Sequence, residues 1–102
     1  MKEYQKQVDE WVGQYKIGYF KPLEIMARLT EETGELAREI NHRFGPKKKK
    51  AAEETREIEE EAADIIFTLV CLANSLDLDL DRGFNSVMAK LYGRDADRWE
   101  KV

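Results

Sequence analysis

The chain has 102 residues, of which 42% are hydrophobic and 37% are charged, and its 17 basic and 21 acidic residues leave a net charge of −4. This length corresponds to one domain covering 1–102, and the hydrophobic content excludes a disordered chain. The acidic balance argues against a nucleic-acid polymer as partner, because binding to a phosphate backbone draws on a basic surface. A single cysteine, Cys71, excludes an internal disulfide.

No segment of the sequence has the length and apolarity of a membrane span. The longest nearly apolar run, from Ala62 to Ala73, contains Asp64 and is shorter than the roughly 20 residues that cross a bilayer. No apolar signal region lies near the first residue. These observations predict a soluble cytoplasmic protein without a membrane partner.

Apolar residues recur every three or four positions in the first half of the chain, which predicts two helices there. The first covers about 2–16. The second begins at Pro22, a residue that the first helical turn tolerates, and ends near Phe44. Gly45 is expected to end this helix in the left-handed conformation, and Pro46 to prevent its continuation.

Two further helices are predicted in the second half. The third covers about 53–75, and the fourth runs from an N-cap at Asp79 to about Tyr92. The four lysines at 47–50 are expected to form an exposed linker, with steering of an anionic ligand as the alternative. Because no stretch alternates with a period of two, the prediction is an all-α fold that resembles a four-helix bundle.

Acidic residues lie on the apolar face of the second predicted helix. The inward positions of this helix are Ile25, Leu29, Glu32, Leu36 and Ile40. Glu35 shares the face of Glu32, whereas Glu31 points about 100° away and is as well placed for the surface as for a ligand. Two carboxylates, Glu32 and Glu35, are therefore expected to face the interior.

The third predicted helix repeats this arrangement with Glu61 and Asp64. A short loop joins the two helices, so we expect them to be antiparallel neighbours with both acidic pairs facing one interior. Burying unpaired carboxylates is costly, and no matching set of Lys or Arg lies on the same faces. Either some of these acids are protonated or they hold a cation, and Mg²⁺ or Mn²⁺ suits an all-oxygen site.

The same acids carry a resemblance to a known family. Residues 31–36 (EETGEL) and 61–64 (EAAD) resemble the EExxE…ExxD pattern of the MazG-like nucleotide pyrophosphohydrolases. That all-α superfamily also contains dimeric dUTPases and phosphoribosyl-ATP pyrophosphohydrolases. The segments most similar to its short, single-domain, YpjD-type members are 22–23, 27–42, 69–75 and the residues Arg94, Asp95, Asp97, Arg98 and Trp99.

The resemblance implies Mg²⁺-dependent hydrolysis of a nucleoside triphosphate, a dNTP or a non-standard NTP, to its monophosphate and pyrophosphate. Such an enzyme removes surplus or non-standard nucleotides. The residues that hold Mg²⁺ in the family correspond here to Glu32, Glu35, Glu61 and Asp64. The metal neutralises phosphate charge and activates a water, and Glu32 or Glu35, with Glu31 as the alternative, would take the proton of that water.

Four further residues are candidates for binding the nucleotide. Lys90 and Arg94 resemble the phosphate-contacting pair of the family, although the helix dipole also favours cations at a helix end. Trp11 offers a flat surface for a base, with packing in the core as the alternative. Asn74 carries an amide that can read a base edge or make a hydrogen bond at a helix end.

The apolar surface of the third helix exceeds what three short neighbours can cover, which predicts self-association. The resemblance likewise implies a homodimer or homotetramer in which two chains complete each pocket. Two alternatives remain open. One is a non-catalytic oligomerisation or partner-binding module whose buried acids serve pairing specificity. The other is a pyrophosphohydrolase that acts on phosphoribosyl-ATP or another pyrophosphate-linked metabolite.

Overall fold

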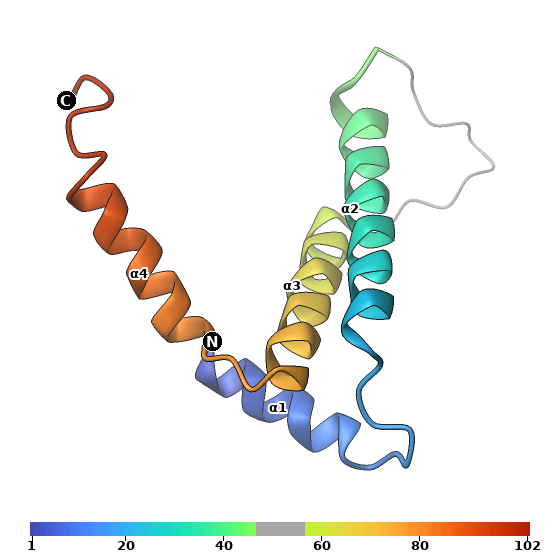
Figure 1. Ribbon diagram of the computed structural model, residues 1–102. Helices are drawn as coiled ribbons and strands as arrows, with labels where there is room; N and C mark the ends of the chain where they lie inside the picture. The colour runs from blue at the N-terminus through green and yellow to red at the C-terminus, as the bar shows by residue number, and fades with distance from the viewer. Residues whose placement is uncertain (47–56) are drawn as a thin grey trace.

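The computed structural model describes residues 1–46 and 57–102, and within these ranges it contains four helices and no β-strand (Figure 1). The helices are α1 (Lys2–Val12), α2 (Pro22–Phe44), α3 (Ile58–Ser75) and α4 (Leu80–Tyr92). This confirms the predicted all-α class and the order of its elements. The lysine run at 47–50 and the residues at 53–56, where the third helix was expected to begin, lie outside the described ranges.

Two helix ends differ from the prediction. α1 ends at Val12 rather than near Lys16, because the chain beyond Gly13 continues in tighter turns, with the Tyr15 amide donating to the Val12 carbonyl at 3.0 Å. α3 begins at Ile58, since the preceding residue, Glu57, has an extended backbone with φ −71° and ψ 137°. Neither difference affects the predicted metal ligands, since Glu61 and Asp64 still lie in α3.

The prediction of a left-handed Gly45 was wrong. Its φ of −81° and ψ of 170° are those of extended backbone, while its amide still donates to the Asn41 carbonyl at 2.9 Å. The reason is Pro46, because the proline ring clashes with a helical conformation of the residue before it and favours an extended one. Proline, rather than a glycine turn, therefore ends α2.

The helices α2 and α3 form an antiparallel pair, and α1 lies across the end of the pair where α3 finishes (Figure 1). Val8 and Val12 of α1 pack against Val70 of α3, which is fully buried. This contact joins α1 to the pair and forms the centre of a small core. The predicted neighbouring of the second and third helices is confirmed.

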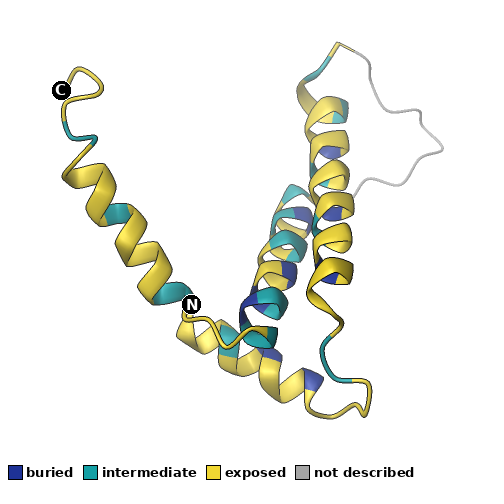
Figure 2. Ribbon diagram, in the orientation of Figure 1, coloured by how far each residue is buried: buried dark blue, intermediate teal, exposed yellow. Residues whose placement is uncertain are grey.

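Helix α4 projects away from the other three, and none of its residues is buried (Figures 1 and 2). Its start is as predicted, because Asp79 caps it by accepting hydrogen bonds from the amides of Asp81 and Arg82. Phe84, 63% exposed, and Val87, 50% exposed, lie on its surface. The described residues of one chain therefore do not form a four-helix bundle.

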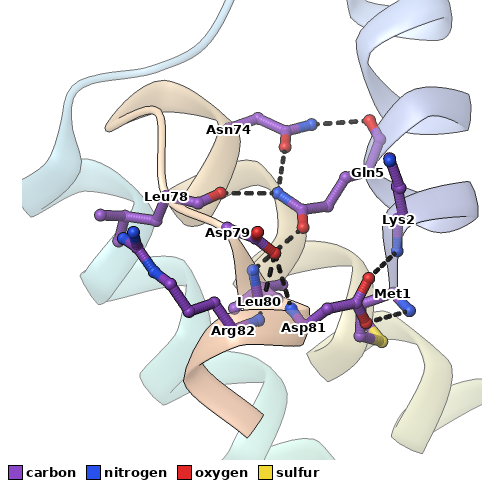
Figure 3. Close-up of polar contacts among 9 residues, drawn as sticks. All are labelled: Met1, Lys2, Gln5, Asn74, Leu78, Asp79, Leu80, Asp81 and Arg82. Carbon is purple, nitrogen blue, oxygen red and sulfur yellow. Dashed lines mark hydrogen bonds and ion pairs between the residues drawn. The ribbon is translucent and has the colours of Figure 1, made fainter. Parts of the chain in front are cut away.

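A network of hydrogen bonds holds the start of α4 against α1 and α3 (Figure 3). The Gln5 amide nitrogen donates to Asn74 Oδ1 at 3.0 Å and to the Leu78 carbonyl at 2.8 Å, and its oxygen accepts from the Leu80 amide at 3.1 Å. Asn74 Nδ2 donates to the Gln5 carbonyl and to the Tyr19 hydroxyl, both at 2.9 Å. The Gln5 and Asn74 side chains thus fix where α4 begins. In the part of the chain that the structure describes, no helix is long and apolar enough to cross a membrane.

Candidate active site

Three of the four acids predicted to hold a metal come together between α2 and α3. One ligand oxygen from each of Glu32, Glu61 and Asp64 lies within 4.8 Å of the others. Glu32 is 7% exposed and Glu61 only 1%, while Asp64 is half-buried. Mg²⁺ binds oxygens at about 2.1 Å, so its ligand oxygens lie up to about 4.2 Å apart, which is close to the spacing in this group. We call these three residues the acidic cluster.

Glu35, the fourth predicted ligand, does not belong to the acidic cluster. It is exposed and lines a cavity beside the cluster, as does Glu31. The two residues therefore lie at the edge of the cluster, in contact with the space that a ligand would enter.

The electrostatics of Glu32 fit the binding of a cation. Burial raises the pKa of Glu32, the negative charges of Glu35 and Asp64 raise it further, and the Arg28 guanidinium lowers it. Glu32 Oε1 accepts a hydrogen bond from Arg28 Nε at 3.1 Å, whereas the buried Oε2 accepts none from the described residues. A buried carboxylate oxygen without a donor is costly, and a divalent cation would compensate it. The residues present therefore fit a divalent metal.

The cavity beside the acidic cluster has a volume of about 820 Å³, within the range of small-molecule sites. Its acidic lining residues lie on α2 and α3. Its aromatic lining residues include Trp11, whose ring makes edge-to-face contacts with Tyr15 and Phe67 at centroid distances of 5.3 and 5.9 Å. We call these two sets of lining residues the acidic side and the aromatic side, and the cavity the acidic cavity.

The other predicted nucleotide-binding residues lie elsewhere. Asn74 lines a second cavity, of about 500 Å³, and its amide makes hydrogen bonds with Gln5 and Tyr19. Lys90 lies in the last turn of α4 and Arg94 just beyond it, and neither lines the acidic cavity. Of the four candidates, only Trp11 lies at the acidic cavity.

Arg28, which lines the acidic cavity, was missed in the interpretation of the sequence. Arg28 lies four residues before Glu32, a spacing that places both on one helix face and could have indicated their ion pair. Tyr19 also lines this cavity, and its hydroxyl donates to Asp9 and accepts from Asn74. The contact with Asn74 spans 55 residues of sequence, so no local pattern indicates it. Burial and the Asp9 carboxylate raise the pKa of Tyr19 to about 12.

Comparison with known proteins assigns the chain to a family. Residues 20–99 match the MazG nucleotide pyrophosphohydrolase domain. The chain is 57% identical over 101 residues to the uncharacterized protein YpjD of Bacillus subtilis (strain 168), a match that covers 99% of this chain and 91% of that protein.

Two crystal structures have the same fold. YPJD from Bacillus subtilis matches with a TM-score of 0.79 at 58% identity, over 87% of this chain and 91% of that one. The Bacillus-conserved MazG protein, a nucleotide pyrophosphohydrolase, matches with a TM-score of 0.79 at 52% identity, over 94% and 93% of the two chains.

The chain therefore belongs to the MazG nucleotide pyrophosphohydrolase family, and it is an enzyme of that class. Within the family it is similar to the short, single-domain proteins of YpjD type. This confirms the resemblance carried by residues 31–36 and 61–64 and the expected hydrolysis of a nucleotide pyrophosphate bond. It also excludes the non-catalytic module as the sole function.

Proposed function

We propose that this enzyme hydrolyses a nucleoside triphosphate, a dNTP or a non-standard NTP, to the monophosphate and pyrophosphate with Mg²⁺ as its cofactor. The observation that carries the proposal is the convergence of the acidic cluster, within 4.8 Å, at the wall of an 820 Å³ cavity. Glu32, Glu61 and Asp64 would hold the metal, with Glu35 joining them from the cavity wall. Mn²⁺ prefers the same oxygen ligands and would replace Mg²⁺.

The chemistry divides between the metal and the carboxylates. When bound, the metal supplies charge neutralisation on the phosphates and lowers the pKa of a water. Glu35 is our first candidate for the base that takes the proton of the attacking water, because it lines the cavity beside the acidic cluster without being one of its three members. Glu31 lines the same wall and is the second candidate, and Glu32 is the third because it is itself in the cluster.

The aromatic side of the acidic cavity is the proposed position of the base. Trp11 is 51% exposed and has room for a stacked ring in addition to its contacts with Tyr15 and Phe67. For Asn74, three hydrogen bonds to neighbouring side chains and backbone favour the structural alternative over reading of a base edge. A base would therefore be held mainly by stacking, which tolerates several bases.

The proposed functional form is a homodimer or homotetramer. The accessible surface of the chain is 8636 Å² and its radius of gyration 17.4 Å, whereas a folded monomer of this mass has about 5,900 Å² and about 13 Å. The excess is about 2,700 Å², and obligate interfaces bury about 1,000–2,500 Å² per chain or more, so the excess has the size of a large obligate interface. Association that covers α4 would bring Lys90 and Arg94 to another chain, where they could contact phosphate. Light scattering that shows only the 11.9 kDa monomer at micromolar concentration would refute this part of the proposal.

The test of the activity is pyrophosphate release from dNTPs, rNTPs and phosphoribosyl-ATP, with Mg²⁺ and with EDTA. We expect Mg²⁺-dependent release from triphosphates that is lost in Asp64→Asn and kept in the control Asp77→Asn, since Asp77 is an exposed acid outside the acidic cavity. Release from phosphoribosyl-ATP alone would replace the proposed substrate with that alternative. Equal activity of Asp64→Asn and the wild type would refute the proposed metal site.

A further inference from the structure

The acidic cavity contains a cation that the metal site leaves without a role. Arg28 is the one Lys or Arg among the described residues that line this cavity. The acidic residues of the same lining are Glu31, Glu32, Glu35 and Asp64. It lies on α2, one turn before Glu32, and its Nε donates to Glu32 Oε1 at 3.1 Å. One guanidinium thus lines a cavity whose carboxylates would attract a metal.

The ion pair of Arg28 with Glu32 leaves most N–H donors of the guanidinium available for another ligand. The contact with Glu32 uses Nε, and within the described ranges neither terminal nitrogen of Arg28 makes a hydrogen bond or ion pair. The Arg28 side chain is 67% exposed, whereas that of Glu32 is 9% exposed. The planar fork of a guanidinium matches the oxygens of a phosphate and binds them with two parallel hydrogen bonds.

The pairing with Glu32 is also easily exchanged. Only the arginine end of this pair is exposed, at 67% of its side chain, so water screens the Arg28 charge and the long side chain loses freedom in the contact, which limits what the pair contributes to stability. A divalent cation that binds Glu32 would supply the positive charge that Arg28 supplies to this carboxylate. Arg28 could then turn to another anion at no electrostatic loss to Glu32.

The most anionic ligand of a nucleotide pyrophosphohydrolase is the phosphate chain. Lys90 and Arg94 do not line the acidic cavity, so among the described residues of one chain Arg28 is the cation that this cavity offers. We propose that Arg28 is a phosphate-binding residue. It pairs with Glu32 in the substrate-free pocket and transfers to non-bridging oxygens of the triphosphate when the nucleotide and its divalent cation enter. This inference rests on the proposed triphosphate substrate.

Binding of inorganic tripolyphosphate in the presence of Mg²⁺, measured by calorimetry, tests the proposal without a choice of base. We expect Arg28→Gln to weaken this binding about 10- to 100-fold, as the loss of a charge-assisted pair does. Arg28→Lys should fall between, because lysine keeps the charge but lacks the fork. The control is Arg43→Gln, an exposed arginine of the same helix outside the acidic cavity, which should bind as the wild type does.

A second readout separates binding from structural support. Mn²⁺ binding without phosphate should be equal or tighter in Arg28→Gln, because the variant removes a positive charge beside Glu32. Parallel loss of Mn²⁺ and tripolyphosphate binding would overturn the proposal, since Arg28 would then only support Glu32. Equal tripolyphosphate binding by Arg28→Gln and the wild type, or none by either, would also overturn it.

The assay of pyrophosphate release distinguishes failure of the Arg28 proposal from failure of the proposed function. Wild-type pyrophosphate release together with unchanged tripolyphosphate binding in Arg28→Gln would refute the role of Arg28 and leave the activity intact. Absence of release from every nucleotide, together with tripolyphosphate binding that depends on Arg28, would refute the proposed substrates and support the phosphate-binding role.

Discussion

Replacing Glu32 with glutamine is expected to stabilise the metal-free protein and to remove the stabilisation that Mg²⁺ provides. Glutamine preserves the size of the side chain but has no negative charge. Glu32 is 7% exposed and belongs to a cluster with two other carboxylates. Burial and the charges of Glu35 and Asp64 raise the pKa of Glu32, so the folded protein disfavours its ionised form. The variant should relieve that cost while it removes a metal ligand.

The size of the effect follows from the spacing of the carboxylates. Two unit charges 4.8 Å apart repel by about 3.5 kcal/mol at an effective dielectric constant near 20. Loss of the Arg28 pair subtracts up to about 1 kcal/mol, and partial protonation of the wild-type carboxyl group subtracts more. A net gain of about 1–2 kcal/mol would raise the melting temperature by about 4–16 °C. Mg²⁺ at one hundred times its Kd would add about 2.7 kcal/mol to the wild type alone.

The sign of the pH dependence is also fixed. A carboxyl group with a raised pKa in the folded state contributes stability below the unfolded value, about 4.3, and loses it as the pH rises through the folded pKa. The metal-free wild type should therefore lose stability over this interval, and Glu32→Gln should lack that component of the loss.

Thermal unfolding in EDTA and in Mg²⁺, at mildly acidic and at neutral pH, measures these effects. The control is Glu10→Gln, an exposed acid of α1, which should behave as the wild type does. A lower melting temperature for Glu32→Gln than for the wild type in EDTA would refute the crowding of charges. Equal stabilisation of both proteins by Mg²⁺ would refute Glu32 as a metal ligand.

Three further substitutions test other parts of the structure. Asn74→Ala removes three hydrogen bonds to Gln5 and Tyr19 and should lower the free energy of unfolding by about 1–3 kcal/mol; an unchanged urea midpoint would contradict this. Asp9→Asn should lower the pKa of Tyr19 from about 12, seen in the phenolate absorbance. Because that pKa is raised, wild-type stability should fall as the pH rises from about 10 through 12, and less so in the variant. Val87→Glu should convert the assembly to a monomer of 11.9 kDa with unchanged helix content; a larger mass would refute the role of α4.

Local rules predict much of the acidic cluster. Glu32 and Glu61 interrupt apolar stripes with helical spacing, and the short connection between their helices leaves antiparallel pairing as the simple arrangement. Both side chains are indeed buried, and one oxygen of each lies within 4.8 Å of the other. How far the buried face of α2 extends around the helix was less predictable. Glu35 shares the helix face of Glu32 but is exposed, because the packing of α3 decides how much of that face is covered.

The inward stripe of α2 also drifts. Ile40 was expected to face the interior, yet it is 40% exposed, and Glu39 is buried at 8%. Two helical turns are about 7.2 residues, so a residue seven positions after Glu32 lies closer to its direction than one eight positions after it. Over several turns, the spacing of 3.6 residues per turn therefore has to be followed, rather than steps of four, to identify the buried positions.

The place of α4 could not be predicted from its own residues. Its length and its Asp79 cap follow from local preferences, whereas its position depends on Gln5 and Asn74, which meet across 69 residues of sequence. Its apolar residues indicate that it needs a partner without indicating which one. The same limit applies to assigning Lys90 and Arg94 to a site, because the position of both residues depends on where α4 lies.

The contact of Val8 and Val12 with Val70 fixes where α1 lies against α3. α1 carries Trp11 on the aromatic side, while α2 and α3 carry the acids, so the valines act as the spacer between the two sides. Valine is stiff in a helix, where one rotamer predominates, and this spacer therefore has a fixed thickness. A bulkier or smaller side chain at Val8 or Val70 would shift the aromatic side relative to the acids without changing any residue that lines the cavity. Enzymes of this architecture can thus diverge in the ligands they accommodate through buried positions that a comparison of cavity residues leaves unnoticed.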